Sequence, residues 1–150
     1  MSRGDNKLYA IPEIEITPDL TLPKVFVQSA HRYGDHKIAM REKEYGIWHP
    51  ITWSEYLAQV KAIALGLVDL GLERGDKVVL IGDNRPEGLW AEMAALCAGA
   101  AAVWVYQDSL IDEVQYIVDN SDAKFVIGEG QEEVDKALAL KDKCPKLKRI

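Results

Sequence analysis

The chain has 150 residues, of which 48% are hydrophobic and 28% are charged. This composition is ordinary for a globular protein that buries one substantial core, and it excludes a chain that is disordered throughout. The formal net charge of −6 excludes attraction of nucleic acid or of an anionic membrane through bulk electrostatics.

Few features of the sequence point to a secreted or membrane-spanning protein. The two cysteines, Cys97 and Cys144, are too few for a disulfide framework or a zinc cluster, which indicates a reducing compartment. No apolar core follows the polar residues 1–7, so they do not resemble a signal peptide. The most apolar stretch, residues 93–106, is shorter than the roughly 18 residues that span a bilayer. We therefore expect a cytoplasmic protein.

The N-terminal end divides into an arm and the start of a folded domain. Residues 1–20 contain Pro12 and Pro18 and alternate apolar with acidic side chains, which is typical of an extended arm rather than a helix. The remaining residues, 21–150, are expected to form one domain. A threonine that can cap a helix opens this domain, and the first predicted helix runs to about Tyr33.

A hairpin and a long helix follow. The strands predicted at 38–41 and 47–53 flank the turn 43–46. Thr52 and Glu55 then form a capping box, in which the hydroxyl and the carboxylate each bind an otherwise unpaired backbone N–H. Gly71 supplies the left-handed C-cap of the helix that follows. Apolar side chains repeat at helical spacing along one face of this helix: Leu57, Val60, Ile63, Ala64, Leu67, Val68 and Leu70.

From residue 76 onward, buried strands alternate with helices. The strands are predicted at 77–81, 102–106 and 124–127, and the helices at 86–98, from Ser109 to about 119, and at 131–143. Crossover connections of this length make neighbouring strands parallel and right-handed. The predicted fold class is therefore α/β: a three-layer Rossmann-like half-domain with parallel strands, preceded by an N-terminal arm, a helix and a β-hairpin. Residues 146–150 look like the approach to another strand.

The turn after strand 77–81 is where open α/β sheets usually present ligands. Many α/β enzymes and receiver-type signalling domains place a working carboxylate at the position of Asp83. The favoured interpretation is that Asp83 or Asn84 caps the next helix, before Pro86 at its first turn. A receiver would also need a phosphorylatable aspartate after another strand, and Asp108 is the sole candidate.

Motifs for phosphate or dinucleotide binding are incomplete. The sequence contains no Walker phosphate loop. Residues 128–133 begin like a dinucleotide fingerprint, but Glu133 stands where the third glycine belongs, and acidic side chains would repel a pyrophosphate. A polar loop with a helix cap is the favoured interpretation of this segment.

The other reactive side chains have simple structural interpretations. The histidines (His31, His36 and His49) lack metal-ligand spacing, and no serine stands in a nucleophile-elbow context. Ser109 is expected to cap a helix. Cys97 is expected to be a buried small hydrophobe, and Cys144 an exposed thiol.

Eight strings in register carry a family resemblance. They occupy residues 21–24, 33–35, 41–48, 52–56, 70–78, 82–87, 106–109 and 121–126. Together they resemble the N-terminal region of AMP-forming acyl-CoA synthetases, in particular the long-chain fatty acid type. Two residues depart from the family's pattern: Gly88 stands where the family usually has tryptophan, and Trp104 where it usually has a small residue.

The resemblance implies a two-step reaction for a full-length parent. A fatty acid carboxylate attacks the α-phosphate of ATP, releasing pyrophosphate, and the thiol of coenzyme A then displaces AMP from the acyl-adenylate. The family's phosphate loop of serine, threonine and glycine ending in Pro-Lys-Gly is absent from residues 1–150. No catalytic, cofactor-binding or metal-binding residue is therefore assigned, and ATP, magnesium and coenzyme A are implied for the parent only.

Residues 21–150 are thus expected to be the N-terminal part of a large adenylation domain, inactive alone. Its expected partners are the rest of that domain and the C-terminal domain of the parent. Self-association through the truncated face, and peripheral membrane association of the parent, stay open. The alternative is a free-standing α/β ligand-binding or regulatory module without catalysis. Whether the gene continues beyond Ile150 with the phosphate loop separates the two hypotheses.

Overall fold

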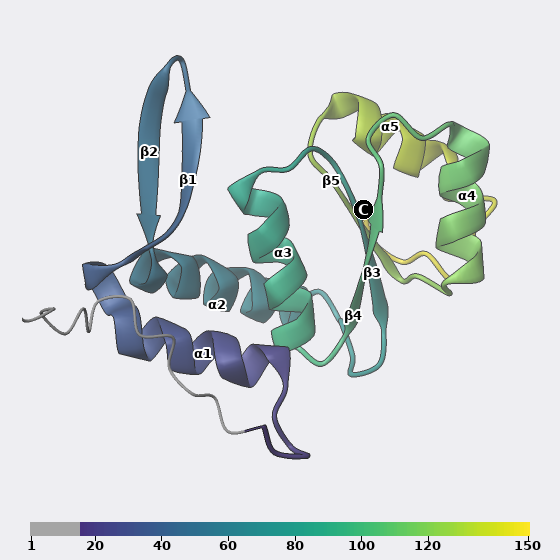
Figure 1. The fold of residues 1–150 in the computed structure, drawn as a ribbon. Coiled ribbons are helices and arrows are strands. Elements are labelled where there is room, and N and C mark those ends of the chain that lie inside the picture. The colour runs from purple at the N-terminus through teal and green to yellow at the C-terminus, as the bar shows by residue number, and fades with distance from the viewer. Residues whose placement is uncertain (1–15) are drawn as a thin grey trace, which may run out of the picture.

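The computed structural model describes residues 16–150. Most of the predicted arm, residues 1–15, lies outside the described residues. The described part is arranged in the following order, shown in Figure 1: α1 (Leu22–Tyr33), the 3-10 turn η2 (Gly34–His36), β1 (Ile38–Glu44), β2 (Ile47–Thr52), α2 (Trp53–Asp69), β3 (Lys77–Ile81), α3 (Pro86–Cys97), β4 (Ala101–Val105), α4 (Ile111–Asn120), β5 (Phe125–Gly128) and α5 (Gln131–Ala139).

A parallel sheet of three strands in the order β4-β3-β5 forms the centre of the molecule. Val79 of β3 pairs with Val103 of β4 on one side and with Val126 of β5 on the other, both in parallel register. Residues 78–81 are buried on both faces of the sheet, as the unbroken apolar run predicts. The prediction of a parallel sheet is confirmed.

Helices cover both faces of this sheet, which gives the three predicted layers (Figure 1). Val78, Leu80 and Phe125 pack with α1, α2 and α3 in one hydrophobic core. Val79 and Val126 point to the opposite face and pack with α4 and α5 in a second core. The alternation of neighbouring residues between the two cores follows from the two-residue period of a strand.

The two N-terminal helices begin and end as predicted. The Thr21 hydroxyl accepts a hydrogen bond from the Lys24 N–H at 3.4 Å at the start of α1. At α2, Thr52 and Glu55 form both bonds of the capping box, at 3.2 and 2.7 Å. Gly71, with φ +95°, ends α2 in the left-handed region.

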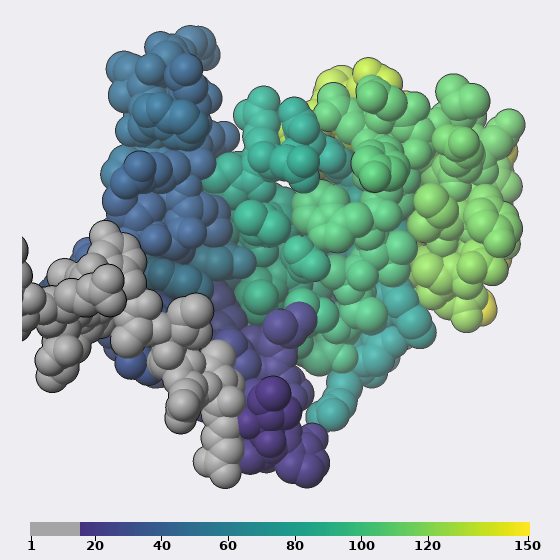
Figure 2. All heavy atoms as spheres, in the orientation of Figure 1, coloured from purple at the N-terminus to yellow at the C-terminus, as the bar shows by residue number. Residues whose placement is uncertain are grey.

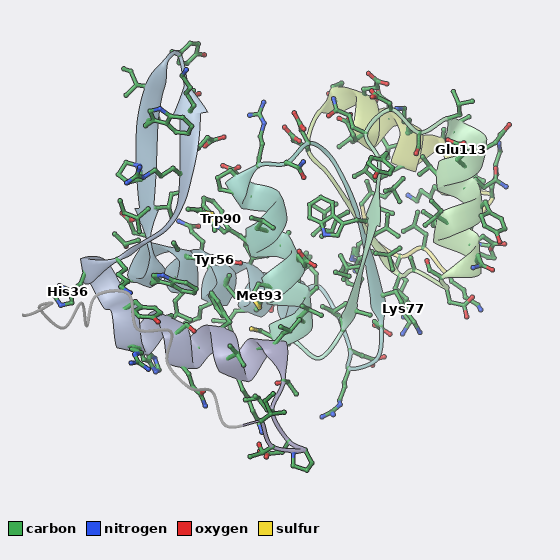
Figure 3. All side chains as sticks on the ribbon, viewed as in Figure 1. His36, Tyr56, Lys77, Trp90, Met93 and Glu113 are labelled. Atoms are coloured by element: carbon green, nitrogen blue, oxygen red, sulfur yellow. The ribbon has the colours of Figure 1, made fainter. Side chains whose placement is uncertain are left out.

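Aromatic packing joins α1, α2 and α3. Tyr56 lies between α2 and α3, near Trp90 and Met93 in Figure 3, and its hydroxyl donates to the Leu89 carbonyl at 3.3 Å. The ring of Phe26 on α1 packs edge-on against Tyr56, with ring centroids 4.6 Å apart. Burial raises the pKa of Tyr56 to about 12, so this hydroxyl stays a donor at neutral pH.

The predicted hairpin forms a separate two-stranded antiparallel sheet, β1-β2. Its first strand extends to Glu44, which is further than the predicted residue 41. The two-residue turn consists of Tyr45 and Gly46, with φ of +46° and +83°. Positive φ at both positions matches the twist of the flanking strands, and it allows pairing to continue up to the turn.

Three details of the prediction are wrong. Ser109 does not cap α4: the helix begins at Ile111, and the Glu113 carboxylate accepts the Leu110 N–H at 2.9 Å instead. The last helix, α5, ends at Ala139 rather than 143, and shorter-range turns follow. Two residues assigned to the apolar face of α2, Val68 and Leu70, are exposed, whereas Leu67 beside them is buried in the core.

The approach of residues 146–150 to another strand is confirmed. Arg149 forms a parallel bridge with Phe125 on the side of β5 away from β3. The Val126 N–H donates to the Arg149 carbonyl at 3.0 Å, and the Arg149 N–H donates to the Lys124 carbonyl at 3.1 Å. This segment therefore runs beside β5 in the direction of a further parallel strand.

Candidate functional site

The topology of the parallel sheet creates a crevice between the ends of β3 and β5. β3 leads into α3 on one face of the sheet, whereas its neighbour β5 leads into α5 on the other face. The loops that follow these two strands therefore diverge. Open α/β sheets bind ligands at such a switch point, outside the carboxyl ends of the strands.

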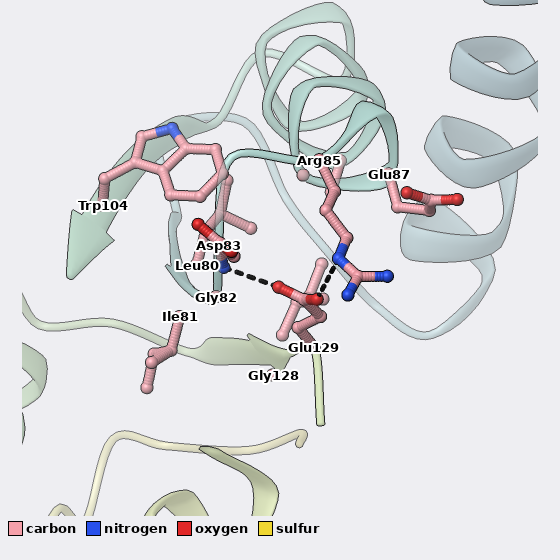
Figure 4. Close-up of a pocket in the computed structure, with 12 residues that line it drawn as sticks. Leu80, Ile81, Gly82, Asp83, Arg85, Glu87, Trp104, Gly128 and Glu129 are labelled. Atoms are coloured by element: carbon pink, nitrogen blue, oxygen red, sulfur yellow. Dashed lines mark hydrogen bonds and ion pairs between the residues drawn. The ribbon is translucent and has the colours of Figure 1, made fainter. Parts of the chain in front are cut away.

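A cavity of about 330 Å³ lies at this switch point (Figure 4). Its apolar walls come from the sheet and from α3, and include Leu80, Ala91, Ile127 and the indole of Trp104. Its polar lining comes from the loops and the start of α3: Asp83, Arg85, Glu87 and Glu129. A volume of this size is at the lower end of the range of small-molecule sites.

Glu129 links the loop after β5 to the loop after β3. One carboxylate oxygen, Oε2, accepts the backbone N–H of Asp83 at 2.5 Å, and the other, Oε1, lies 2.7 Å from Arg85 Nε. Both bonds are drawn in Figure 4. A Cβ at Gly82 would lie 2.7 Å from Glu129 Cβ, so the absence of a side chain at Gly82 permits this close approach.

Asp83 and Asn84 do not cap α3, so the cap prediction is wrong. The N-cap is Arg85, and its side chain makes no capping hydrogen bond. The Asp83 carboxylate instead accepts the N–H of Asn84, its immediate neighbour, at 2.8 Å. Pro86 at the first turn has no N–H and so needs no acceptor, which reduces the demand for a cap.

The wider side of the crevice continues over β4. A second cavity of about 810 Å³ is lined by residues 82–85, by Leu89 and Glu92 of α3, and by residues 104–108. Asp83 and Asp108, which follow adjacent strands, both line this cavity and are both exposed. Trp104 lines both cavities.

The segment resembling a dinucleotide fingerprint is a capped loop, as interpreted from the sequence. The Glu133 carboxylate accepts the N–H of Gly130 at 3.0 Å, and Glu133 is buried. A Cβ at Gly130 would lie 2.8 Å from the same carboxylate oxygen. The glutamate thus occupies the space beside the start of α5 into which a pyrophosphate would have to fit.

The burial of the two cysteines is the reverse of what the sequence predicted, so that prediction is wrong. Cys97 is exposed and Cys144 is buried. Cys97 is the last residue of α3, whereas Cys144 packs with Leu140 and Leu147 in the second core. Partial burial raises the pKa of the Cys97 thiol, and burial likewise raises that of Cys144.

The charges of the crevice do not suit a nucleoside triphosphate. Three carboxylates, Asp83, Glu87 and Glu129, surround the single guanidinium of Arg85. That guanidinium and the N–H of Asp83 are already bound to Glu129. Across residues 16–150, no group of three or more histidine, cysteine or acidic side chains could hold a metal ion. A phosphate group in this crevice would therefore meet mainly negative charge.

Comparisons with known proteins agree with the family resemblance noted in the sequence. The family model of AMP-binding enzymes matches residues 26–150. The long-chain-fatty-acid–CoA ligase ACSBG2 of Xenopus laevis is 30% identical over 138 residues, which cover 92% of this chain and 18% of that protein. The long-chain-fatty-acid–CoA ligase heimdall of Drosophila melanogaster is 27% identical over 139 residues, which cover 91% of this chain and 20% of that protein.

Solved structures share the fold. A putative long-chain-fatty-acid CoA ligase from Rhodopseudomonas palustris superposes with a TM-score of 0.72 at 23% identity, over 89% of this chain and 33% of that one. The N-terminal domain of FACL13 from Mycobacterium tuberculosis gives a TM-score of 0.70 at 20% identity, over 85% of this chain and 32% of that one. The chain thus spans about a fifth of the length of the curated relatives that it matches.

Proposed function

The chain belongs to the family of AMP-binding enzymes, and we propose that it is the N-terminal part of the adenylation domain of a long-chain fatty acid–CoA ligase. The observation that carries this proposal is the continuous match over 92% of the chain to a ligase of this type. The fold supports it, because 89% of the chain superposes on the structure of a putative long-chain-fatty-acid CoA ligase from Rhodopseudomonas palustris.

The proposed parent reaction joins a fatty acid to coenzyme A at the expense of ATP. The fatty acid carboxylate attacks the α-phosphate of ATP, which forms an acyl-adenylate and releases pyrophosphate. The thiol of coenzyme A then attacks the acyl carbon, which forms the thioester and releases AMP. Such chemistry needs preorganised donors and cations around the phosphates. The sequence contains no phosphate loop and the crevice is acidic, which supports the proposal that other parts of the parent perform these steps.

The role proposed for this segment is a scaffold. Its sheet carries the loops at the carboxyl ends of β3 and β5, and Glu129 holds these two loops together through Asp83 and Arg85. Residues 146–150 lead along β5 toward a further strand. The parent would extend the sheet on this side, with the remainder of the adenylation domain and the C-terminal domain as its intramolecular partners.

ATP–pyrophosphate exchange with a long-chain fatty acid tests this proposal. The assay compares the 150-residue chain with a parent reading frame that includes the downstream phosphate loop. Exchange by the parent and none by the chain alone is the expected result. An open reading frame without that loop, or a parent inactive toward every fatty acid, would contradict the ligase assignment.

A second candidate function is a free-standing ligand-binding module. The cavity of about 330 Å³ at the switch point is the observation that favours it. Binding of a small molecule by the 150-residue chain, weakened by a substitution of Trp104 that leaves the chain folded, would support this alternative.

Across residues 16–150, no helix has the length and apolar character required to cross a membrane.

A further inference from the structure

β4 forms an open edge of the parallel sheet. Among residues 16–150, only β3 pairs with it, whereas β5 at the other side of the sheet carries the bridge between Phe125 and Arg149. In Figure 2 the green atoms of the β4 segment reach the surface between α3 and α4. Ala101 and Trp104 on this strand are exposed. An open edge offers backbone N–H and C=O groups to a further strand.

The hydrogen bonds to β3 show which backbone groups of β4 face outward. The Ala101 N–H donates to the Asp76 carbonyl at 2.9 Å, so the backbone of this residue faces β3. Backbone groups of successive residues point to opposite sides of a strand. The N–H and C=O of Ala102 and of Trp104 therefore face the open edge.

The edge has none of the features that usually prevent pairing with another chain. Natural sheets protect their edges with charged side chains, prolines or bulges. Residues 93–107 contain no charged residue and no proline. Residues 101–105 pair with residues 77–81 in continuous register, without a bulge. The β4 edge is thus suited to accept another strand.

We propose that β4 pairs antiparallel with β4 of a second copy of this chain, around a two-fold axis at Val103. In this register Ala102 of each copy lies opposite Trp104 of the other, and the outward groups of each such pair form two hydrogen bonds. The small side chain of Ala102 leaves room for the indole opposite it. Val103 meets Val103 of the second copy in a non-hydrogen-bonded pair, in which side chains are closest. Two sheets of three strands then join into one sheet of six.

The charge at the amino end of β4 favours a second copy in this orientation. The side chain of Arg74 lies against Gly99, where a Cβ would be 3.1 Å from Arg74 Cγ. Arg74 is exposed, and the ion pairs found among residues 16–150 do not include it. The acidic residues near it in sequence, Glu73 and Asp76, are both paired with Lys124. The amino end of β4 thus presents a positive charge.

The carboxyl end of β4 is acidic. Three carboxylates line the cavity of about 810 Å³ at this end: Asp83, Glu92 and Asp108. The basic side chains nearby are engaged, since Arg85 is paired with Glu129 and Lys136 with Glu132. Antiparallel pairing places residue 99 of one copy opposite residue 107 of the other, so Arg74 comes beside this acidic end. A parallel arrangement would bring like charges together.

Sedimentation equilibrium of the 150-residue chain, at protein concentrations from about 1 to about 200 µM, tests the proposal. We expect a reversible equilibrium between monomer and dimer, with no larger species. Ala102→Pro should abolish the dimer, because it removes an N–H that faces the open edge. It should leave the monomer folded, since the bonds of β4 to β3 come from other residues, and circular dichroism with thermal unfolding checks this.

Charge reversal tests the orientation independently. Arg74→Glu or Asp108→Arg places like charges at both ends of the interface, so each variant alone should raise the dimer dissociation constant about ten-fold or more. A mixture of the two variants should recover the dimer as a heterodimer, because both contacts are then attractive. Arg41→Glu is the matched control: it makes the same change in net charge as Arg74→Glu, but on the separate β1–β2 sheet, and it should dimerise like the unaltered chain.

A monomer at every concentration would overturn the proposal, and slow hydrogen exchange of the Ala102 and Trp104 N–H groups in that monomer would assign the edge to an occupant within the chain. Oligomers larger than a dimer would overturn it as well. So would a mixture of Arg74→Glu and Asp108→Arg that associates no better than either variant alone. None of these measurements uses ATP or a fatty acid, so their outcome does not depend on the ligase assignment.

Discussion

The indole of Trp104 on β4 occupies the space beside the bare Cα of Gly88 on α3. A Cβ at Gly88 would lie 2.5 Å from Cη2 of Trp104, closer than two such atoms can approach. These two residues are the positions at which the sequence departs from its resemblance to long-chain acyl-CoA synthetases; that resemblance implies tryptophan at the first and a small residue at the second. We infer that the two departures compensate, because the large side chain comes from the strand instead of the helix.

The contact between Trp104 and Gly88 predicts that substitutions at these two positions are strongly coupled in their effect on stability. Gly88→Trp alone should lower the free energy of unfolding by about 1–3 kcal/mol or more, because the new side chain overlaps the indole of Trp104. Trp104→Gly alone should also destabilise, since it leaves a void against α3. The double variant should recover most of the loss. Chemical denaturation of all four proteins measures the coupling energy, and simple additivity would contradict the compensation.

Gly66 provides the control that separates the effect of helix propensity from the effect of the Trp104 contact. Gly66 lies in α2, and a Cβ there would meet no atom within 4 Å. Gly66→Ala should therefore stabilise the protein by about 1 kcal/mol, as expected for a helix interior. Gly88→Ala should fail to stabilise unless Trp104 is also replaced by glycine. Equal stabilisation by the two single alanine variants would show that Trp104 does not restrict position 88.

The ion pair between Asp76 and Lys124 predicts a dependence of stability on pH. Asp76 is buried, its Oδ1 lies 2.6 Å from Lys124 Nζ, and its Oδ2 accepts the Glu73 N–H at 3.0 Å. Burial alone would raise the pKa of Asp76, but these hydrogen bonds and the Lys124 charge outweigh it and lower the pKa below its usual value. The carboxylate therefore stabilises the fold above the pKa of the unfolded chain, and this stabilisation is lost as the pH falls through the folded pKa.

Asp76→Asn should lower the free energy of unfolding at neutral pH by about 1–3 kcal/mol, because Lys124 loses its closest partner. The difference from the unaltered protein should shrink in acid, which denaturation at several pH values measures. The control is Asp122→Asn, since Asp122 forms an exposed pair with Lys146 and its pKa is lowered by that contact. Its stability at neutral pH should barely change.

The bonds of Glu129 predict a local rather than a global effect. Arg85 is largely exposed, so loss of its ion pair in Glu129→Ala should change the free energy of unfolding by less than about 1 kcal/mol. The backbone N–H of Asp83 would lose its acceptor, and its hydrogen exchange should accelerate. Asp83→Ala should leave stability nearly unchanged, because its side chain caps no helix. A large global loss in Asp83→Ala would restore the capping interpretation.

The two cysteines should differ in reactivity toward a thiol reagent. Cys97 is exposed and should react in the folded protein, although its raised pKa slows the reaction at neutral pH. Cys144 is buried in the second core and should react only after unfolding. Labelling followed by mass analysis of the peptides identifies the thiol. Rapid labelling of Cys144 under native conditions would contradict the burial found here.

Local patterns in the sequence determined most of the fold. The strand 77–81 was predicted with the bounds that β3 has, because an apolar run closed by a turn has few other interpretations. The capping box of Thr52 and Glu55 was predictable because its partners are three residues apart. The alternation of strands and helices predicted the parallel sheet, since each helix is long enough to be the crossover that parallel neighbours require.

Only the tertiary structure decided which side chains meet at the crevice. Asp83 and Glu129 are 46 residues apart, and no local periodicity predicts that one will bind the other. The contact of Trp104 with Gly88 and the burial of Cys144 likewise depend on how α3 and the C-terminal turns pack on the sheet. A hydrogen-bonding side chain in a loop can be satisfied by a near neighbour or by a distant strand, and only the packed fold determines which partner it binds.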